Sequence, residues 1–421
     1  MTGLIRSWVE TANAAGAQFP LNNLPYGVFS VAGGHHTLGV AIGDQIVDLQ
    51  AASVAGLIPQ SASSASAPFQ QTSWNAFMAQ GPLAWAAFRD WLQAELAEGA
   101  SPRLAPLLVA QSIADMHLPI EVAEYTDFYA SRHHAKNVGT MFRGADNALP
   151  PNWLHIPIGY NGRASSVVVT GTEVRRPWGQ IKTPDEAAPC FAPSARFDIE
   201  LEIGAIVGTP SSGPITVAEA DTNIFGYVLL NDWSARDIQA WEYQPLGPFQ
   251  AKATATTIGA WIVSTAALSP FRCDTPAREF ELLEHLKDCG PMLYDIDLAV
   301  TLAPADKPAT KITTTNYNQM YYSAAQQLAH HTTSGCPMRV GDLLGSGTIS
   351  GPDMSSRGAL LELTWGGKEP ITLDTSEVRR FLEDGDTVTL HGAANGDGFT
   401  IGFGECAGTL LPALSDPYNR D

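Results

Sequence analysis

Carboxylates recur on one face of a predicted β-strand. Residues 197–208 read FDIELEIGAIVG, and side chains along an extended strand alternate between its two faces. Asp198, Glu200 and Glu202 therefore share a face, while the apolar residues between them pack on a core. For the two glutamates alone, a solvated sheet face is the simpler interpretation, and we interpret Asp198 as structural.

Two more carboxylates favour a cation site. Asp232 ends the apolar run FGYVLLND, where an unpaired carboxylate is unfavourable to bury. Asp127 lies between aromatic residues in YTDFY. If these two residues converge with Glu200 and Glu202, they form an all-oxygen site for Mg²⁺ or Ca²⁺.

A histidine and a distant glutamate suggest a general base. His133 and His134 are adjacent in a helix predicted over 131–140, so they point about 100° apart and only one can face a given site. Glu362 interrupts the apolar run of a strand predicted over 358–366. A carboxylate there could orient an imidazole that activates water. A surface histidine and a salt-bridged glutamate are the ordinary alternatives.

Cationic and amide side chains concentrate in residues 231–252, NDWSARDIQAWEYQPLGPFQAK. Arg236 and Gln239 are three residues apart and can share a helical face. Together with Lys252 they are of the types that stabilise a developing oxyanion. A solvated charged helix is the alternative.

Two parts of the chain, with different predicted secondary structure, must position these residues. Short β-rich runs over 26–50, a helix over 81–99 and a second helix over 101–116 precede a domain boundary near 118. Short strands then dominate, with a further helix over 276–288. We expect a mostly β, α+β protein with a small N-terminal and a larger C-terminal domain.

The amino-acid composition makes some classes of binding partner unfavourable. The 421 residues are 45% hydrophobic and carry a formal net charge of −19. Such an acidic surface repels nucleic acids and anionic membranes, although a locally positive cleft can still bind a small anion. The five cysteines form no CxxC pair, and neither a signal peptide nor a membrane-spanning run is visible. We expect a cytoplasmic protein.

Long blocks of sequence resemble one family. They are YTDFYASRHHAKNVGTMFRG, PPNWLHIPIGYNGRASSVVVTGT, FDIELEIGAIVG, NDWSARDIQAWEYQPLGPF and GSGTISGP. On these blocks the chain resembles the fumarylacetoacetases over nearly its whole length. The resemblance implies an SH3-like barrel domain (1–118), a mixed β-roll domain (119–421) and a homodimer. It also implies hydrolysis of a diketo-dicarboxylate, 4-fumarylacetoacetate, to fumarate and acetoacetate, which ends tyrosine and phenylalanine catabolism.

The resemblance also implies residue roles. It implies a Ca²⁺ or Mg²⁺ site at Asp127, Glu200, Glu202 and Asp232, with Lys252 and Thr256 beside a magnesium position. His134 is the implied base and Glu362 its partner, while Arg236, Gln239 and Lys252 receive the oxyanion. The implied substrate contacts are Tyr129, Arg143, Tyr160, Gln239, Tyr243 and Thr348.

The sequence departs from the family pattern at few places. His133 stands where the family pattern has Gln, Asn161 replaces a His, and the segment after Lys252 is altered. These changes affect the pocket wall and the choice between the two histidines. The rival functions are a 2-oxo-alkenoate hydratase or decarboxylase or an acylpyruvase of the same superfamily, and a non-catalytic module that binds small acids.

Overall fold

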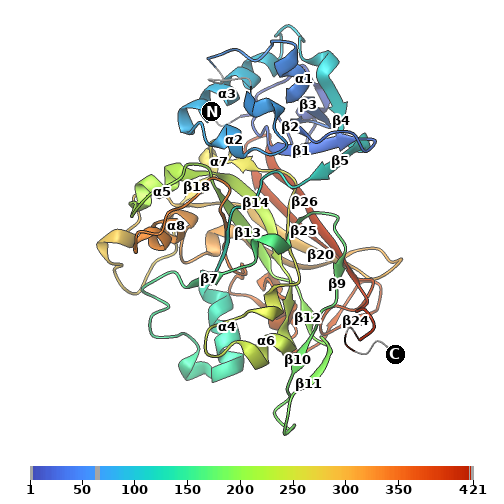
Figure 1. Cartoon of the computed structure of the whole chain (residues 1–421), viewed down its shortest axis with the longest axis vertical. Coiled ribbons are helices and arrows are strands. Elements are labelled where there is room, and N and C mark those ends of the chain that lie inside the picture. Colours follow the sequence, from blue (N-terminus) through green and yellow to red (C-terminus); the bar gives the residue numbers. More distant parts are fainter. Residues whose placement is uncertain (1–2, 62–66, 417, 419–421) are drawn as a thin grey trace.

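A computed structural model describes residues 3–61, 67–416 and 418 (Figure 1). It confirms the mostly β, α+β class. The polar, low-complexity sequence SASSASAP at 61–68 predicts an exposed loop, but most of it lies outside the described residues.

The N-terminal part folds around an antiparallel sheet with strand order β4-β3-β2-β1-β5. Its strands are β1 (Tyr26–Val31), β2 (Thr37–Ile42), β3 (Gln45–Asp48), β4 (Leu108–Ala110) and β5 (Ala114–His117). Its helices are α1 (Leu49–Val54), α2 (Asn75–Met78) and α3 (Pro82–Leu96). Helix α3 confirms the predicted helix over 81–99.

A mixed sheet with order β7-β6-β22-β13-β14-β16-β8 lies at the centre of the C-terminal part, and β17 also pairs with β14. Its strands are β6 (Tyr125–Phe128), β7 (Gly159–Asn161), β8 (Val167–Val169), β13 (Leu201–Val207), β14 (Ile224–Asp232), β16 (Thr256–Ile258), β17 (Val263–Ser264) and β22 (Leu343–Gly345). Every residue of β13 and β14 is buried, which is typical of strands covered on both faces.

A second C-terminal sheet has the order β21-β20-β25-β26-β9. It comprises β9 (Val174–Arg175), β20 (Asp297–Ala303), β21 (Thr310–Asn316), β25 (Thr387–Asn395) and β26 (Thr400–Leu411), of which β25 and β26 run along the back of the molecule in Figure 1. The remaining strands form separate two-stranded sheets: β10 (Trp178–Ile181) with β11 (Cys190–Pro193), β12 (Phe197–Asp198) with β15 (Ser234–Ala235), β18 (Arg272–Cys273) with β19 (Leu293–Tyr294), and β23 (Ile371–Thr372) with β24 (Val378–Arg379).

The C-terminal helices are short. They are α4 (Arg132–Arg143), α5 (Val217–Asn223), α6 (Arg236–Glu242), α7 (Thr265–Leu268), α8 (Ala324–Thr332) and α9 (Leu360–Leu363). Helix α4 confirms the helix predicted over 131–140, and the hydroxyl of Ser131 caps it by accepting from the His134 N–H.

The two parts share a hydrophobic core. Tyr26 of β1 packs against Trp74 and also against Phe225 of β14, with ring centroids 4.8 and 5.0 Å apart. Tyr26 and Ile262 exchange backbone hydrogen bonds across the junction. The N-terminal sheet is therefore docked on the sheet that carries the carboxylates.

Three predicted elements are wrong. Residues 101–116 form strands β4 and β5 with short 3₁₀ turns instead of a helix, because their apolar residues complete the N-terminal sheet and Pro106 cannot donate within a helix. Residues 276–288 contain only the 3₁₀ turn Glu284–Leu286. Leu282 and Leu286 are buried in the core through this turn, whereas Phe280 and Leu283 stay exposed.

The third wrong element is the strand predicted over 358–366. This segment contains the single-turn helix α9, which ends where Trp365 adopts a φ of 47°. The predicted strand over 197–208 is also interrupted, because β12 ends at Asp198 and β13 begins at Leu201.

Candidate active site

The carboxylates of Asp127, Glu200, Glu202 and Asp232 form one buried cluster. Each offers an oxygen, and these oxygens all lie within 4.8 Å of one another. The pairing of β6, β22, β13 and β14 brings them together. The loop after β22 also helps to hold the Glu202 carboxylate in place. Gly347 has a φ of 78°, and its N–H donates to Glu202 Oε2 at 2.9 Å. The structure therefore brings the four predicted cation ligands to one point.

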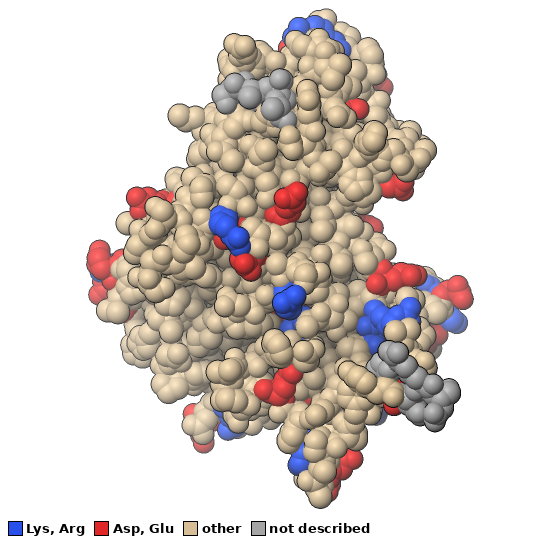
Figure 2. All heavy atoms as spheres, in the orientation of Figure 1, with Lys and Arg blue, Asp and Glu red and all other residues tan. Residues whose placement is uncertain are grey.

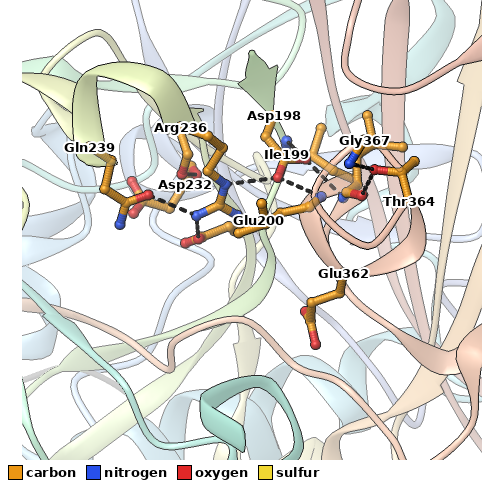
Figure 3. Close-up of polar contacts among 12 residues, drawn as sticks. Asp198, Ile199, Glu200, Asp232, Arg236, Gln239, Glu362, Thr364 and Gly367 are labelled. Atoms are coloured by element: carbon orange, nitrogen blue, oxygen red, sulfur yellow. Dashed lines mark hydrogen bonds and ion pairs between the residues drawn. The ribbon is translucent and has the colours of Figure 1, made fainter. Parts of the chain in front are cut away.

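Two cationic side chains border this cluster. The Lys252 ammonium contacts Glu200 and lies 2.5 Å from Asp232 Oδ2. Arg236 Nη1 lies 2.6 Å from Glu200 Oε1 and donates to Gln239 Oε1 at 3.1 Å. The contacts of Arg236 with Glu200, Asp198 and Gln239 are drawn in Figure 3. Thr256 lies deeper, and its hydroxyl donates to Asp232 Oδ1 at 3.1 Å.

The protein's own cations leave part of the cluster without a partner. Asp127 Oδ1 and Glu202 Oε1 are buried and accept no hydrogen bond. Burial and the charge of Asp232 raise the pKa of Asp127 well above its ordinary value, and burial with the charges of Asp127 and Asp232 does the same for Glu202. An all-oxygen donor set with unpaired oxygens fits a hard divalent cation, which would favour the ionised forms.

Glu200 behaves differently from its neighbours. Burial acts to raise its pKa, but the charges of Lys252 and Arg236 outweigh burial and hold the pKa well below its ordinary value. The same carboxylate in turn helps to raise the pKa values of Lys252 and Arg236 against the effect of burial. Glu200 is therefore a fixed negative charge between two fixed positive charges.

His134 and Glu362 form a buried hydrogen-bonded pair. His134 Nδ1 lies 2.6 Å from Glu362 Oε2, and the glutamate also accepts from Asn137 Nδ2 and Ser350 Oγ, each at 2.8 Å. Burial acts to raise the pKa of Glu362, but His134 and these hydrogen bonds lower it. An ionised glutamate only accepts, so Nδ1 donates and Nε2 is the nitrogen left for a water molecule.

A cavity of about 360 Å³ connects the base to the acidic cluster. Most of the predicted site residues line it: Asp127, Tyr129, His134, Arg143, Tyr160, Glu200, Arg236, Gln239, Tyr243, Lys252 and Thr348. Glu202, Asp232, Thr256 and Glu362 lie behind this lining. Every predicted substrate-contacting residue therefore borders the same cavity as the predicted base.

The neighbouring histidine lies elsewhere. His133 borders a separate surface depression with Arg132 and Lys136. Burial and these two positive neighbours lower the pKa of His133. The structure therefore places His134, and not His133, on the cavity.

Sequence reasoning missed several residues around the cavity. Asn137 follows His134 by three positions, a spacing that could have identified it as a partner of Glu362. Val138 and Phe142 continue this face of α4 along the cavity, and the ring of Phe142 lies tilted against that of Tyr243, with ring centroids 6.0 Å apart. Ser350 lies in the block GSGTISGP, but its type alone gave no signal.

Figure 2 shows a face with scattered acidic and basic side chains. Within the described part of the chain, no helix combines the length and apolar character needed to cross a bilayer.

The chain matches two family models. Residues 22–119 match the model described as Fumarylacetoacetase N-terminal, and residues 124–411 match the one described as Fumarylacetoacetate (FAA) hydrolase C-terminal. The chain belongs to the fumarylacetoacetase family. The two matched ranges contain all the residues of the acidic cluster, the His134–Glu362 pair and the cavity lining.

Curated members of the fumarylacetoacetase family are similar over nearly their whole length. The Caenorhabditis elegans fumarylacetoacetase is 48% identical over 410 residues, covering 94% of this chain and 97% of that protein. The human protein is 47% identical over 412 residues, covering 95% and 98%. The Arabidopsis thaliana protein is 45% identical over 421 residues, covering 97% and 99%.

Solved structures share the fold at lower identity. The fumarylacetoacetate hydrolase of psychrophilic Exiguobacterium antarcticum has a TM-score of 0.52 and 15% identity, covering 93% of this chain and all of that chain. The maleylpyruvate hydrolase of Sphingobium sp. SYK-6 has a TM-score of 0.51 and 15% identity, with the same coverage. At this identity the likeness concerns the fold alone.

Proposed function

We propose that this chain hydrolyses a carbon–carbon bond of 4-fumarylacetoacetate, releasing fumarate and acetoacetate. The similarity to curated fumarylacetoacetases over nearly the whole chain carries this proposal. The cavity adds chemical support, because it combines a carboxylate-bound histidine, a set of cationic donors and an oxygen-rich cluster. The reaction is the last step of tyrosine and phenylalanine catabolism.

His134 is the proposed general base. Its Nδ1 is held by Glu362, so Nε2 takes a proton from water while the water oxygen adds to the carbonyl that bears the fumaryl group. General-base assistance of this kind is typically worth about 10²–10⁴ in rate. When the carbon–carbon bond breaks, its electron pair stays on the acetoacetate carbon, and the imidazolium returns the proton there.

The alkoxide formed by addition needs positive donors. Arg236 is 4% exposed, and its Nη2 is buried without a hydrogen-bond partner although its other nitrogens are engaged. We assign this free N–H to the oxyanion, together with Gln239 and Lys252 on the same cavity. Removing one such donor typically lowers kcat by about 10²–10³-fold.

Polar groups around the cavity would hold the two carboxylates and the carbonyls of the substrate. Arg143 contributes a cation, and Tyr129, Tyr160 and Tyr243 contribute phenols. The Thr348 hydroxyl is buried without a partner and is free to bind a substrate oxygen. This local composition explains how a chain of net charge −19 can bind a dianion.

The acidic cluster is the proposed metal site. Asp127, Glu200, Glu202 and Asp232 would hold Ca²⁺ or Mg²⁺, and Lys252 and Thr256 would flank it. A bound ion of this type supplies a Lewis acid that stabilises negative charge on diketone oxygens.

Several finer assignments are also proposals. By resemblance to the family we infer a homodimer, a cytoplasmic location, a boundary near residue 118 and an SH3-like barrel for the N-terminal sheet. Oligomeric state can be measured by light scattering of the purified protein.

One assay tests the proposed reaction. The protein is incubated with fumarylacetoacetate and divalent ion, and the products are quantified by chromatography. Hydrolysis predicts fumarate and acetoacetate in equal amounts. A hydrated product or released CO₂ would instead identify a hydratase or decarboxylase, and unchanged substrate would contradict an enzymatic role.

A further inference from the structure

The carboxylate of Asp198 contacts both halves of the proposed catalytic machinery. It is fully buried, at 0% exposure, at the end of β12. Its Oδ1 accepts from the N–H groups of Ile199 and Leu360, each at 2.8 Å. Its Oδ2 accepts from the Leu361 N–H at 2.9 Å and from Arg236 Nε at 2.8 Å. Figure 3 shows Asp198 between Arg236 and the segment that carries Glu362.

Helix α9 depends on this distant carboxylate. The helix is a single turn, and its N-cap residue, Ala359, has no side-chain acceptor for the first N–H groups. Asp198 accepts from the first two of these, although 162 residues separate it from Leu360. A single turn has little stability of its own, so Asp198 fixes the backbone that projects Glu362 toward His134.

The same carboxylate orients Arg236. The guanidinium is planar, so a hydrogen bond at Nε and another at Nη1 set the direction of Nη2. Asp198 holds Nε, and Glu200 and Gln239 hold Nη1. Nη2, the donor assigned to the oxyanion, is thereby left without a hydrogen-bond partner, on a residue that lines the cavity.

We propose that Asp198 is a positioning residue for the hydrolysis: one buried carboxylate sets both the orientation of the His134–Glu362 base and the direction of the Arg236 donor. The proposal rests on the function proposed above. Asp198 touches neither the cavity nor a reacting atom, so it acts only through these two groups.

The principal test replaces Asp198 by asparagine. Asp198→Asn keeps the size of the side chain, but its NH₂ group brings donors against other donors. In the Oδ2 position it faces Arg236 Nε and the Leu361 N–H, and in the Oδ1 position it faces the N–H groups of Ile199 and Leu360. Misplacing catalytic groups by about 1 Å lowers rates by about 10²-fold. We expect kcat to fall by about that factor with KM changed by less than about threefold, and a kcat loss below about tenfold overturns the proposal.

Double-mutant cycles separate positioning from general destabilisation. Glu362→Gln and Arg236→Lys are each measured alone and combined with Asp198→Asn. If Asp198 acts through both groups, each substitution lowers kcat by a smaller factor in the Asp198→Asn protein than in the wild type. Independent, multiplicative losses in either cycle overturn the proposal.

Asp386 provides a matched control. It is also a buried aspartate, 1% exposed, that accepts from an arginine, Arg379 Nε at 2.9 Å, and from a backbone N–H, that of Glu383 at 2.8 Å. It does not line the cavity. Asp386→Asn should therefore lower the melting temperature by a similar amount but keep the wild-type kcat. When Asp386→Asn is combined with Glu362→Gln or Arg236→Lys, it should leave the factor by which each of these substitutions lowers kcat unchanged.

Hydrogen–deuterium exchange tests the inference without turnover, so its failure can be distinguished from failure of the proposed reaction. Asp198→Asn should accelerate exchange in peptides covering 358–366, and Asp386→Asn should not. If exchange there is unchanged, the proposal is wrong. Asp198→Ser is the second variant if Asn gives insoluble protein. If neither variant folds, Asp198 is a folding residue and the proposal is again overturned.

Discussion

His134 and Glu362 are in direct contact, with 2.6 Å between Nδ1 and Oε2, although 228 residues separate them in the chain. The pair is buried, with the glutamate at 0% exposure. Asn137 and Ser350 occupy other acceptor positions of the same carboxylate. The glutamate is therefore held in one orientation from three sides, and the imidazole that it contacts has a fixed ring position and tautomer.

Replacing Glu362 by glutamine should reduce catalysis without preventing binding. The amide can still accept from His134 Nδ1, but it lacks the negative charge that stabilises the imidazolium formed during the reaction. We expect kcat to fall by about 10²-fold or more, with KM changed by less than about threefold. Steady-state kinetics with fumarylacetoacetate measures both constants.

Glu377 is a suitable comparison residue, because it contacts Lys307 away from the cavity. Glu377→Gln should retain wild-type kcat. Full activity of Glu362→Gln would show that the negative charge of the pair does not contribute to the reaction.

The adjacent histidines provide an internally matched pair of variants. His134 lines the cavity, whereas His133 lines a separate surface depression. His134→Ala should lower kcat by about 10²–10⁴-fold while still binding fumarate, and His133→Ala should stay close to the wild type. Kinetics and calorimetric titration with fumarate measure these effects. Equal and severe losses in both variants would contradict the assignment of His134.

The sequence predicted the elements whose signals are local. The helix predicted over 131–140 is α4, and the apolar run FGYVLLND that ends at Asp232 lies in β14. The alternation in FDIELEIGAIVG correctly separated carboxylates from apolar residues. It also suggested a half-solvated strand, whereas Glu200 and Glu202 are buried because their face is turned toward the cluster.

The missed features depend on contacts that are distant in sequence. Helix α9 could not be predicted, because the acceptor for its first N–H groups is Asp198 on another element. The segment 101–116 has helical composition but extends along β1 and β3, whose edges it completes. Ser350 acquires its role only when the fold brings it to Glu362.

The acidic cluster should make the stability of the metal-free protein depend on pH. Folding raises the pKa values of Asp127 and Glu202. An acid with a raised pKa in the folded state contributes stability below its unfolded pKa, and this is lost as pH rises through the folded pKa. The free energy of unfolding of the metal-free protein should therefore fall as pH rises above about 4, the ordinary pKa of a carboxyl group, whereas bound Ca²⁺ or Mg²⁺ favours the ionised forms.

Melting temperatures at several pH values, with and without divalent ion, measure this effect. The stabilisation by the ion should be larger at pH 8 than at pH 5. Glu200 and Lys252 do not obscure it, because their shifts, down and up respectively, lie outside this pH range. Glu202→Gln should reduce both the ion effect and its pH dependence. An ion effect that is absent, or equal at all pH values, would contradict a metal site here.

Gly139 of α4 should be intolerant of any side chain. A Cβ at this position would overlap the carbonyl oxygen of Ala148 and approach Arg143 Nη2 to 2.7 Å. Arg143 Nη2 donates to this carbonyl at 2.7 Å, and Arg143 lines the cavity. In an open helix, replacing glycine by alanine stabilises by about 1 kcal/mol. Here we expect Gly139→Ala to destabilise the protein by about 1–3 kcal/mol and to raise KM, because Arg143 is displaced.

Denaturant unfolding and steady-state kinetics measure the two effects. Gly213 is the control glycine, since no atom lies within 4 Å of the position that its Cβ would take. Gly213→Ala should change the free energy of unfolding by less than about 0.5 kcal/mol and leave KM unchanged. If Gly139→Ala is as stable as the wild type and has the same KM, then the contact between α4 and Ala148 does not position Arg143 for substrate binding.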